Sequence, residues 1–328
     1  MPLLITRRDL KQLLSMADVV EAVEAGFREY KIGRCSVPLR MPVKVAQAEG
    51  LFLFMPACLE GGGAFGTKII SVFPGNAGRG VSTLQSVYLL NDPATGELLA
   101  IMDGLLLTAL RTGAASAVAT RHLSRKSSSV LGVIGAGAQA PFQVEAILTV
   151  RPLHCVVVYD PHAEAVEKFA KAVSVEFAVP VKVASDPQEV IKTADILVTV
   201  TTSRQPVFDG RDLRSGTHIN AVGAFTPEMR EIDDATVTRA RIVVDTYEGC
   251  LSEAGDLLIP MKAGRLSRER IEADLGEIVM GVKPGRRTDD EITLFESVGF
   301  AVEDVVTARL AYRRAKEKGL GREFSLET

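Results

Sequence analysis

Residues Val130–Ala140 read VLGVIGAGAQA, the pattern of a buried strand that runs into a glycine turn and then into a helix. In a dinucleotide-binding fingerprint the first glycine, here Gly135, makes the tight turn, and the second, Gly137, lets the backbone approach a pyrophosphate. The third small residue, Ala140, lets the helix pack closely on the strand. The free N–H groups of the first helical turn then face the phosphates. The stretch therefore predicts a Rossmann βαβ unit.

A second apolar run, Cys155–Tyr159, ends in Asp160, which follows the first glycine by 160 − 135 = 25 residues. The spacing expected for the ribose-binding carboxylate is about 20 residues. A carboxylate there accepts hydrogen bonds from the ribose hydroxyls of NAD and repels the 2′-phosphate of NADP. We therefore predict NAD as the cofactor, with NADP less favoured. The alternative is that Asp160 is only a strand-end turn residue before Pro161.

Composition limits the class of protein. The chain has 328 residues, 47% of them hydrophobic, and a formal net charge of −3, which suits two compact domains. Its lysines and arginines form no basic stripe, so we expect neither nucleic acid nor a membrane as a partner. The four cysteines form no CxxC pair and are typical of reduced thiols. The N-terminal MPLLITRRDLKQLL has its charges after the apolar run, unlike a signal peptide, so a cytoplasmic location is expected.

The part of the chain before residue 130 is predicted to be a separate α+β domain. Residues 15–33 carry apolar side chains at helical spacing, which predicts a helix with one buried face. Residues 40–102 form short apolar runs separated by Gly, Pro and Asn, which is typical of an antiparallel sheet. Within them, DPATG at 92–96 is a hairpin turn signal. An alanine-rich helix over 105–123 then leads into the first Rossmann strand.

After residue 130 apolar strand patterns alternate with helical patterns, which predicts a parallel, doubly wound sheet. The strands are predicted at 155–159, 181–184, 196–200, 218–222 and 242–245, and the helices between them at 163–177 and 187–193. A helix over 268–279, a short run ITLF and a final amphipathic helix over 301–318 complete the chain. We expect the last helix to pack back on the N-terminal domain. The chain is thus predicted to be an α/β protein with a substrate-binding domain, 1–120 with 304–328, and an NAD-binding Rossmann domain, 121–303.

Three cations in the first domain are candidate site residues: Arg40, Lys68 and Arg111. Lys68 is followed by two isoleucines and Arg111 lies among small neutral helix residues, so neither is typical of a solvated charged face. Buried cations need anionic partners. One interpretation is that each pairs with an internal Asp or Glu. The other is that they bind a substrate carboxylate, which arginine can hold with two parallel hydrogen bonds.

Histidine is sparse, and this excludes several chemistries. His122, His154, His162 and His218 show neither metal-ligand spacing nor a carboxylate pattern for a histidine acid and base pair. We therefore predict no metal site, and the pattern argues against zinc alcohol dehydrogenases and against 2-hydroxy-acid dehydrogenases, which use a histidine to move the hydroxyl proton. An amine or imine substrate avoids that requirement, because its nitrogen can carry the proton.

Five sequence blocks are spread over nearly the full length of the chain: FGTKII (65–70), LRTGAASAVAT (110–120), VIGAGAQA (133–140), HINAVGAFTPEMREID (218–233) and ESVGFAVEDVV (296–306). In these blocks, and in their order, the chain resembles the ornithine cyclodeaminase and mu-crystallin family. The resemblance implies a homodimer formed through the N-terminal sheet, an NAD(P)-binding Rossmann domain, and small α-amino or α-imino acids as substrates.

The resemblance also implies roles for individual residues. Arg40, Lys68 and Arg111 would hold the substrate carboxylate, and Lys68 would also serve in proton transfer. Together with the fingerprint glycine Gly135, the residues implied to line the cofactor are Thr112, Gly137, Ala138, Gln139, Asp160, Thr201 and Val222.

Position 225 distinguishes the reactions known in this family. Cyclodeaminases carry an aspartate two residues after the glycine of the INAVG block, where this chain has Phe225. Phenylalanine cannot act as a base, which favours a reductase or dehydrogenase of the pyrroline-2-carboxylate reductase, ketimine reductase or alanine dehydrogenase type. Two alternatives stay open. Glu228 or Glu231 could supply a cyclodeaminase base, or the chain could be a non-catalytic NAD(P)-binding protein of the mu-crystallin kind.

Overall fold

The computed structural model describes residues 1–61, 63–76 and 78–326. The chain divides into two compact units, Met1–Arg111 with Phe300–Thr328, and Thr112–Gly299. The boundary falls inside one helix, α3 (Gly104–Leu123), whose residues 104–111 belong to the first unit. None of the helices in the described ranges is long and apolar enough to cross a bilayer.

The first unit contains an eight-stranded sheet in which all neighbours are antiparallel except β1 and β7. In spatial order the strands are β16 (Arg322–Glu323), β1 (Leu3–Ile5), β7 (Leu98–Asp103), β6 (Leu84–Asn91), β5 (Ala64–Val72), β4 (Gly50–Leu59) and β2 (Cys35–Ser36), with β3 (Met41–Val45) also paired to β4. The predicted antiparallel sheet over 40–102 is therefore confirmed. So is its hairpin turn, where the Gly96 N–H donates to the Asp92 carbonyl at 2.8 Å.

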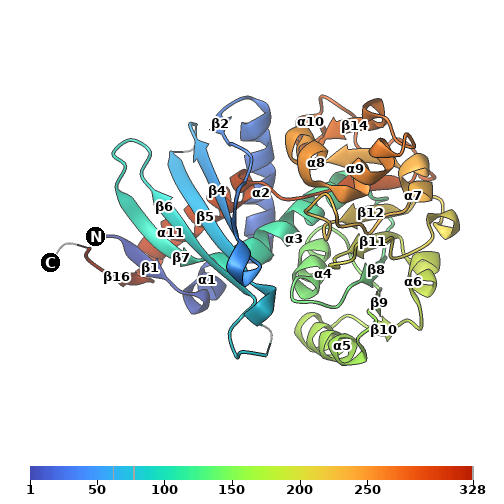
Figure 1. Ribbon diagram of the computed structural model, residues 1–328, viewed down its shortest axis with the longest axis horizontal. Coiled ribbons are helices and arrows are strands. Elements are labelled where there is room, and N and C mark those ends of the chain that lie inside the picture. The colour runs from blue at the N-terminus through green and yellow to red at the C-terminus, as the bar shows by residue number, and fades with distance from the viewer. Residues whose placement is uncertain (62, 77, 327–328) are drawn as a thin grey trace. The chain divides into compact units, whose positions relative to one another are not determined.

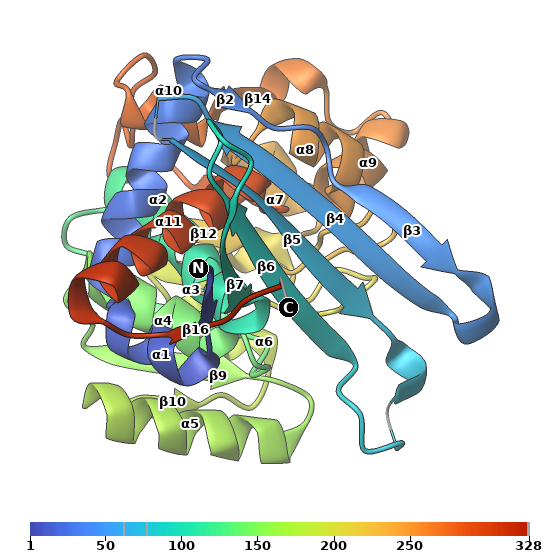
Figure 2. The ribbon, with the colours of Figure 1, turned by 90° about the vertical axis from the view of Figure 1, so that its left-hand side faces the viewer.

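Helices cover one face of this sheet, as Figure 2 shows for α2 (Met16–Lys31) and α11 (Ala301–Lys318). A short helix, α1 (Arg7–Leu13), completes the layer. Strand β4 explains the arrangement, because alternate side chains from Leu53 to Leu59 are buried under the helices and those between them are half-buried. Gly26 of α2 faces Val302 and Val306 of α11, and a Cβ at Gly26 would lie 3.1 Å from both valines. The final helix thus packs on the N-terminal sheet, as expected.

The second unit contains a fully parallel sheet of eight strands. In spatial order they are β10 (Val181–Val183), β9 (Cys155–Tyr159), β8 (Val130–Ile134), β11 (Ile196–Thr199), β12 (His218–Ala221), β15 (Thr293–Glu296), β13 (Arg241–Val244) and β14 (Ile271–Asp274). The first five reproduce the 3-2-1-4-5 part of the order of a dinucleotide-binding sheet, with the reversal between β8 and β11, while the sixth place is taken by β15, the last strand of the unit along the chain.

Helices lie on both faces of the parallel sheet (Figure 1). The helices are α4 (Ala140–Leu148), α5 (Ala163–Phe177), α6 (Pro187–Thr193), α7 (Asp234–Arg239), α8 (Tyr247–Glu253), α9 (Gly255–Lys262) and α10 (Leu275–Val279). Helices α4 and α5 bury Val144, Ile147, Phe169 and their neighbours against one face. Helices α6 to α9 bury residues such as Val190, Val237 and Leu257 against the other. The sheet is doubly wound, as predicted.

One predicted element is wrong. Residues 268–279 were expected to form a single helix, but they form a 3₁₀ turn (Arg268–Arg270), the edge strand β14 and the short helix α10. The buried residues Ile271, Leu275 and Ile278 are four and then three residues apart, which imitates one face of a helix. Pairing of β14 with β13 decides the outcome, and Asp274 begins the helix by accepting the Glu277 N–H at 2.7 Å.

Candidate active site

Lys68 is a buried cation on β5, on the sheet face that α11 covers. Its side chain is 1% exposed, and its cross-strand neighbours are Met55 and Tyr88. The ammonium Nζ donates to both carboxylate oxygens of Asp304 on α11, at 2.9 Å and 2.8 Å. Alternate side chains of β5 face the helices, and Lys68 occupies one of these buried positions, where a hydrophobic residue is usual. Asp304 on α11 supplies the opposite charge.

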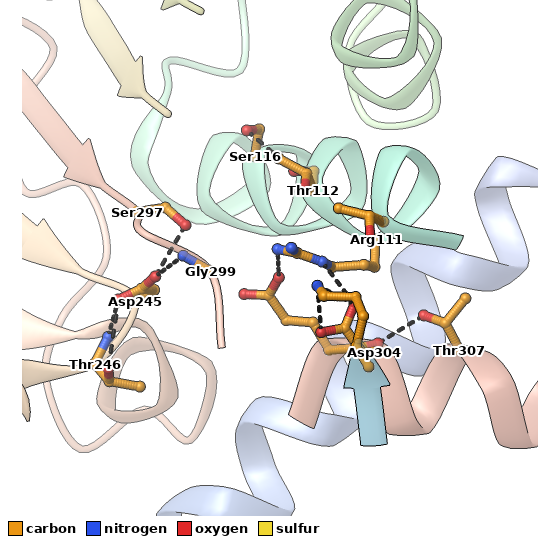
Figure 3. Close-up of polar contacts among 12 residues, drawn as sticks. Arg111, Thr112, Ser116, Asp245, Thr246, Ser297, Gly299, Asp304 and Thr307 are labelled. Carbon is orange, nitrogen blue, oxygen red and sulfur yellow. Dashed lines mark hydrogen bonds and ion pairs between the residues drawn. The ribbon is translucent and has the colours of Figure 1, made fainter. Parts of the chain in front are cut away.

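Arg111 joins the same cluster from α3, and Figure 3 shows its side chain reaching toward Asp304. Nε donates to Asp304 Oδ1 at 3.0 Å, and Nη1 donates to Glu303 Oε2 at 2.7 Å. Although burial opposes it, these two carboxylates hold the pKa of Arg111 above its usual value. Asp304 thus bridges the two cations, which is the internal ion pairing foreseen by one of the two interpretations.

Arg40, the third predicted cation, lies half-buried just before β3 and contributes to the same electrostatic environment. Burial and the positive charges of Arg111 and Arg40, opposed by Asp304, together lower the pKa of Lys68 to about 8. A lysine with a pKa near 8 can donate and accept protons close to neutral pH. The structure therefore brings the three predicted cations into one electrostatic cluster.

Tyr88 adds a hydroxyl to this cluster. It is fully buried opposite Lys68, and among the described residues its hydroxyl has no hydrogen-bond partner. Burial raises the pKa of Tyr88 well above its usual value, and Asp304 adds to the effect. Gly66 makes room for the ring, because a Cβ at Gly66 would lie 2.2 Å from the tyrosine oxygen.

The glycine turn of the second unit has the geometry that a dinucleotide requires. Gly135 has φ +105°, and a Cβ there would lie 2.7 Å from the carbonyl oxygen of Val200. A Cβ at Gly137 would point into open space, and Ala138 next to it is exposed. The following helix α4 begins after Gln139, which makes no side-chain capping hydrogen bond. An open backbone at an uncapped helix N-terminus fits a phosphate.

Asp160 lies at the end of β9 and faces this turn. Its carboxylate accepts the Ala136 N–H at 2.8 Å and the His162 N–H at 2.9 Å. Burial alone would raise the pKa of Asp160, but these hydrogen bonds lower it, so the group is ionised at neutral pH. The alternative of a strand-end turn residue explains its bond to His162. Its bond to the glycine turn is what the ribose-binding position of the fold leads one to expect.

The other predicted cofactor residues lie in the second unit as well. Thr201 and Val222 follow β11 and β12, which neighbour each other in the sheet beside β8. In open α/β sheets, ligands bind in the crevice outside the carboxyl ends of the strands, where the strand order reverses. Thr112 lies on α3, and its neighbour Gly113 brings this helix close to α4, since a Cβ there would lie 2.5 Å from the carbonyl oxygen of Phe142.

Phe225 and its neighbouring carboxylates lie in the loop after β12. Phe225 is half-buried and packs against the core of the second unit. Glu231, which could have replaced the missing aspartate, is fully buried, and its carboxylate accepts hydrogen bonds from Thr199, Thr201 and Gly223. A base that is buried and already holds three donors is poorly suited to accept a substrate proton. Glu228 is exposed.

No group of three or more His, Cys, Asp or Glu side chains in the described part of the chain could hold a metal ion. His218 illustrates why the histidines of this chain gave no sequence signal for a metal site. It is fully buried, and it is bonded to Thr293 at 2.9 Å and to Asn220 at 3.2 Å. Burial lowers the pKa of His218 to about 3, so it is a neutral core residue.

Sequence reasoning missed Asp304 and Glu303, the carboxylates that organise the cation cluster. A signal was present: both fall in the block ESVGFAVEDVV, and Asp304 shares a helical face with Ala301, Val305 and Ala308. A carboxylate on the apolar face of an amphipathic helix requires a buried partner. That observation predicts a buried cationic partner for Asp304, but it does not say which cation this is.

The parallel sheet, its glycine turn and the carboxylate of Asp160 bonded to that turn are typical of a dinucleotide-binding protein of the Rossmann class. The chain belongs to the ornithine cyclodeaminase/mu-crystallin family, whose model matches residues 2–319. It is 39% identical over 320 residues to the Delta(1)-pyrroline-2-carboxylate reductase of a Bacillus cereus strain, with 97% of this chain and 98% of that protein covered.

Two solved structures extend the comparison. The Delta(1)-pyrroline-2-carboxylate reductase of Thermococcus litoralis, in complex with NADH and L-proline, has a TM-score of 0.95 and 45% identity, covering 98% of this chain and 100% of that one. An archaeal alanine dehydrogenase dimer with bound NAD has a TM-score of 0.93 and 37% identity, covering 99% of both chains.

Proposed function

We propose that this protein is an NAD-dependent reductase of small α-imino acids, such as Δ1-pyrroline-2-carboxylate, and equally a dehydrogenase of the corresponding amino acids. The observation that carries the proposal is the buried cluster in which Asp304 bridges Lys68 and Arg111. The named activities of the relatives above, and the NADH and L-proline bound to one of them, support it.

Arg111 is proposed to hold the substrate carboxylate. Its Nε donates to Asp304 and its Nη1 donates to Glu303. The two carboxylates therefore fix the plane of the guanidinium, and we propose that its remaining N–H groups are presented to the substrate carboxylate. A fixed cation of this kind orients the substrate, and such positioning contributes several kcal/mol to lowering a barrier. Arg40 adds positive charge near Lys68.

Lys68 is proposed to supply the proton in imine reduction. Reduction of an imine is fastest when the nitrogen is protonated, because protonation makes the carbon electrophilic. An ammonium whose pKa is about 8 is still largely protonated at neutral pH and gives up its proton more readily than an ordinary lysine. Asp304 orients the ammonium with two hydrogen bonds.

The cofactor is proposed to be NAD, held by Thr112, Gly135, Gly137, Ala138, Gln139, Asp160, Thr201 and Val222. When bound, it supplies or accepts the hydride. Gly137 and Ala138 leave the backbone open for the pyrophosphate, and the ionised Asp160 favours a ribose with free hydroxyls over a 2′-phosphate.

We assign substrate binding and dimerisation to the first unit, Met1–Arg111 with Phe300–Thr328, and cofactor binding to the second unit, Thr112–Gly299. The sequence had placed the same division at residues 120 and 303. A homodimer through the first sheet is supported by the sheet face opposite the helices. Large apolar side chains there, such as Phe54 and Ile69, are half-buried, and on the adjoining β3 Met41 is 57% exposed. Apolar patches of this kind mark protein interfaces. The four free cysteines fit a cytoplasmic location.

One assay panel tests the proposal. The substrates incubated with NADH and with NADPH are pyrroline-2-carboxylate, piperideine-2-carboxylate, and pyruvate with ammonia or methylamine. Ornithine is incubated with the oxidised cofactors. The proposal expects absorbance loss at 340 nm with an imino acid and NADH. Steady ammonia release from ornithine without a change at 340 nm would identify a cyclodeaminase, and cofactor binding without turnover would identify a binding protein.

A further inference from the structure

Glu231 joins two loops at the carboxyl edge of the parallel sheet. Its side chain is fully buried. Oε1 accepts the Thr201 N–H at 2.6 Å, and Oε2 accepts the Gly223 N–H at 2.8 Å and the Thr199 hydroxyl at 2.9 Å. All three donors belong to the ends of β11 and β12 or to the residues that follow them.

We call the Glu231 carboxylate and its three donors the Glu231 clamp. It lies just beyond the last backbone hydrogen bond between β11 and β12. The last backbone hydrogen bond between the two strands runs from the Val222 N–H to the Thr199 carbonyl, at 3.1 Å. One residue further along, the two loops are connected through the Glu231 carboxylate. Parallel strands that separate at this edge open the crevice in which ligands bind. Glu231 therefore sets how far these two loops stand apart.

The surrounding chain is built around this carboxylate. A Cβ at Gly223 would lie 2.4 Å from the Thr201 carbonyl oxygen and 2.6 Å from the Glu231 carboxyl carbon, so only glycine lets its N–H reach the carboxylate. Asp256 in the first turn of α9 fixes the backbone behind it, accepting the N–H groups of Glu231 and Ile232, each at 2.7 Å. The position of the carboxylate is thus held from both sides.

We propose that Glu231 is a positioning residue that sets the two loops receiving the nicotinamide half of the cofactor. The inference rests on the proposed function in that it takes the ligand to be a nicotinamide dinucleotide. In a doubly wound sheet each half of the dinucleotide lies over one half of the strands. Asp160 on β9 marks the adenosine half, so the loops after β11 and β12 belong to the nicotinamide half.

The matching of donors and acceptors makes a carboxylate necessary. Two N–H groups and a hydroxyl all point at the side chain, and both of its oxygens are used. Glutamine has the same shape but would turn its NH₂ group toward one of these donors, leaving a buried N–H without an acceptor. The loops would then separate, while the fingerprint turn and Asp160 would be unaffected.

Glu231→Gln tests the inference by comparing two ligands. NADH occupies both halves of the site, whereas ADP-ribose lacks the nicotinamide ring. Isothermal titration is expected to show NADH binding weakened by about tenfold or more, as the loss of about 1.4 kcal/mol would give, and ADP-ribose binding changed by less than about twofold.

Glu296→Gln is the matched control. Glu296 ends β15 at the same edge of the sheet and is equally buried, and neither of its oxygens has a hydrogen-bond partner in the described chain.

Equal affinities of Glu231→Gln and wild type for NADH would overturn the inference. So would an equal loss for NADH and ADP-ribose, because that would show a general defect of the fold. If Glu231→Gln does not fold, Thr199→Val decides, since it removes only the hydroxyl donor. The same selective weakening of NADH is expected at smaller magnitude, and unchanged NADH binding would reject the clamp. Wild-type protein that binds NADH but reduces no imino acid would refute the proposed function while leaving this comparison intact.

Discussion

At the scale of single residues, Lys68 combines two demands that usually conflict. A buried ammonium is stabilised by Asp304, but burial and two neighbouring cations reduce its proton affinity. Replacing a buried ion pair by apolar groups often costs little stability, whereas removing one partner is strongly destabilising. A lysine that is largely charged at pH 7 but loses its proton near pH 8 is therefore better explained by proton transfer than by stability.

The pH dependence of imine reduction follows from this lysine. Because the pKa of Lys68 is lowered to about 8, the ammonium loses its proton as the pH rises through 8. We expect kcat/KM for imino-acid reduction to fall about tenfold per pH unit above 8. The groups that face Lys68 are Asp304, Arg111, Arg40 and Tyr88.

Lys68→Arg separates the enzyme's titration from that of the substrate. Arginine stays charged over the whole range, so the variant should be slower and should lose the break near pH 8. Initial rates between pH 6 and 10, within the range where the fold is stable, give both profiles. A break that persists unchanged in Lys68→Arg would assign the titration to another group.

Asp160 is expected to set the choice between the two nicotinamide cofactors. Its carboxylate is ionised and faces the glycine turn through Ala136. A like-charge contact with a 2′-phosphate costs on the order of several kcal/mol, so NADH should bind more tightly than NADPH. Asp160→Ser should narrow or invert the difference, as measured by fluorescence titration. Equal affinities in the wild type would remove the basis for the assignment.

Arg111→Lys should impair substrate binding selectively. Lysine keeps the charge between Glu303 and Asp304 but cannot present a fixed planar edge to a carboxylate. We expect the KM for an imino acid to rise by about tenfold, equivalent to about 1.4 kcal/mol, with the Kd for NADH changed less than twofold. Steady-state kinetics and titration give both values. If the KM is unchanged while thermal stability falls, Arg111 serves only as an ion-pair partner of α11.

At the scale of elements, the first turn of α9 carries a buried acid with a measurable effect on stability. Burial and the neighbouring Glu231 raise the pKa of Asp256 to about 8. In the unfolded chain its pKa is near 3.9, so between about pH 4 and 8 the folded state binds more protons, and this acid makes stability fall as pH rises.

Asp256→Asn should remove this fall in stability with rising pH. Asparagine keeps an oxygen for the N–H groups of Glu231 and Ile232 but carries no charge. The variant should therefore gain on the wild type progressively from about pH 4 to 8, so that its advantage in Tm is largest above pH 8. Differential scanning calorimetry at pH 5 and pH 8.5 measures the change. A Tm difference that is the same at both pH values would contradict the raised pKa.

Helices and strands whose own spacing of apolar residues identifies them could be predicted from the sequence. The helix α11 and the strands β8 and β9 fall within a residue or so of their expected bounds. The stretch from Arg268 to Val279 could not, because its apolar spacing fits a helix, and only pairing with β13 makes Ile271–Asp274 a strand. Edge strands of two or three residues, such as β2 and β16, likewise depend on their partners.

At the scale of the whole molecule, the candidate site depends on the chain returning to its first unit. Residues 68, 111 and 304 come from β5, α3 and α11, separated by up to 236 residues of sequence. The cations could be recognised locally, because charges among apolar or small residues are unusual. Their shared carboxylate could not be assigned to them, because nothing local to Asp304 says which cation it meets. The Glu231 clamp was beyond reach for the same reason.

The reaction of the whole protein with ornithine is the decisive prediction for the class of enzyme. We expect the purified protein to reduce an α-imino acid but not to convert ornithine to proline. A cyclodeaminase must deprotonate a side-chain ammonium whose pKa is near 10.4, and at neutral pH only about one molecule in a few thousand is already neutral. Phe225 can neither hold nor deprotonate it, and Glu231 is buried and bonded to three donors.

Phe225→Asp tests the same reasoning in the opposite direction. Position 225 is half-buried in the loop closed by Glu231, so an aspartate there would retain some contact with solvent. The variant should retain imine reduction and gain a low rate of proline and ammonia formation from ornithine, followed by chromatography. Imine reduction skips the deprotonation step, since the carboxylate site, the cofactor and one proton suffice. Wild-type protein that forms proline from ornithine as fast as it reduces imines would show that another residue serves as the base, and that the reductase assignment is wrong.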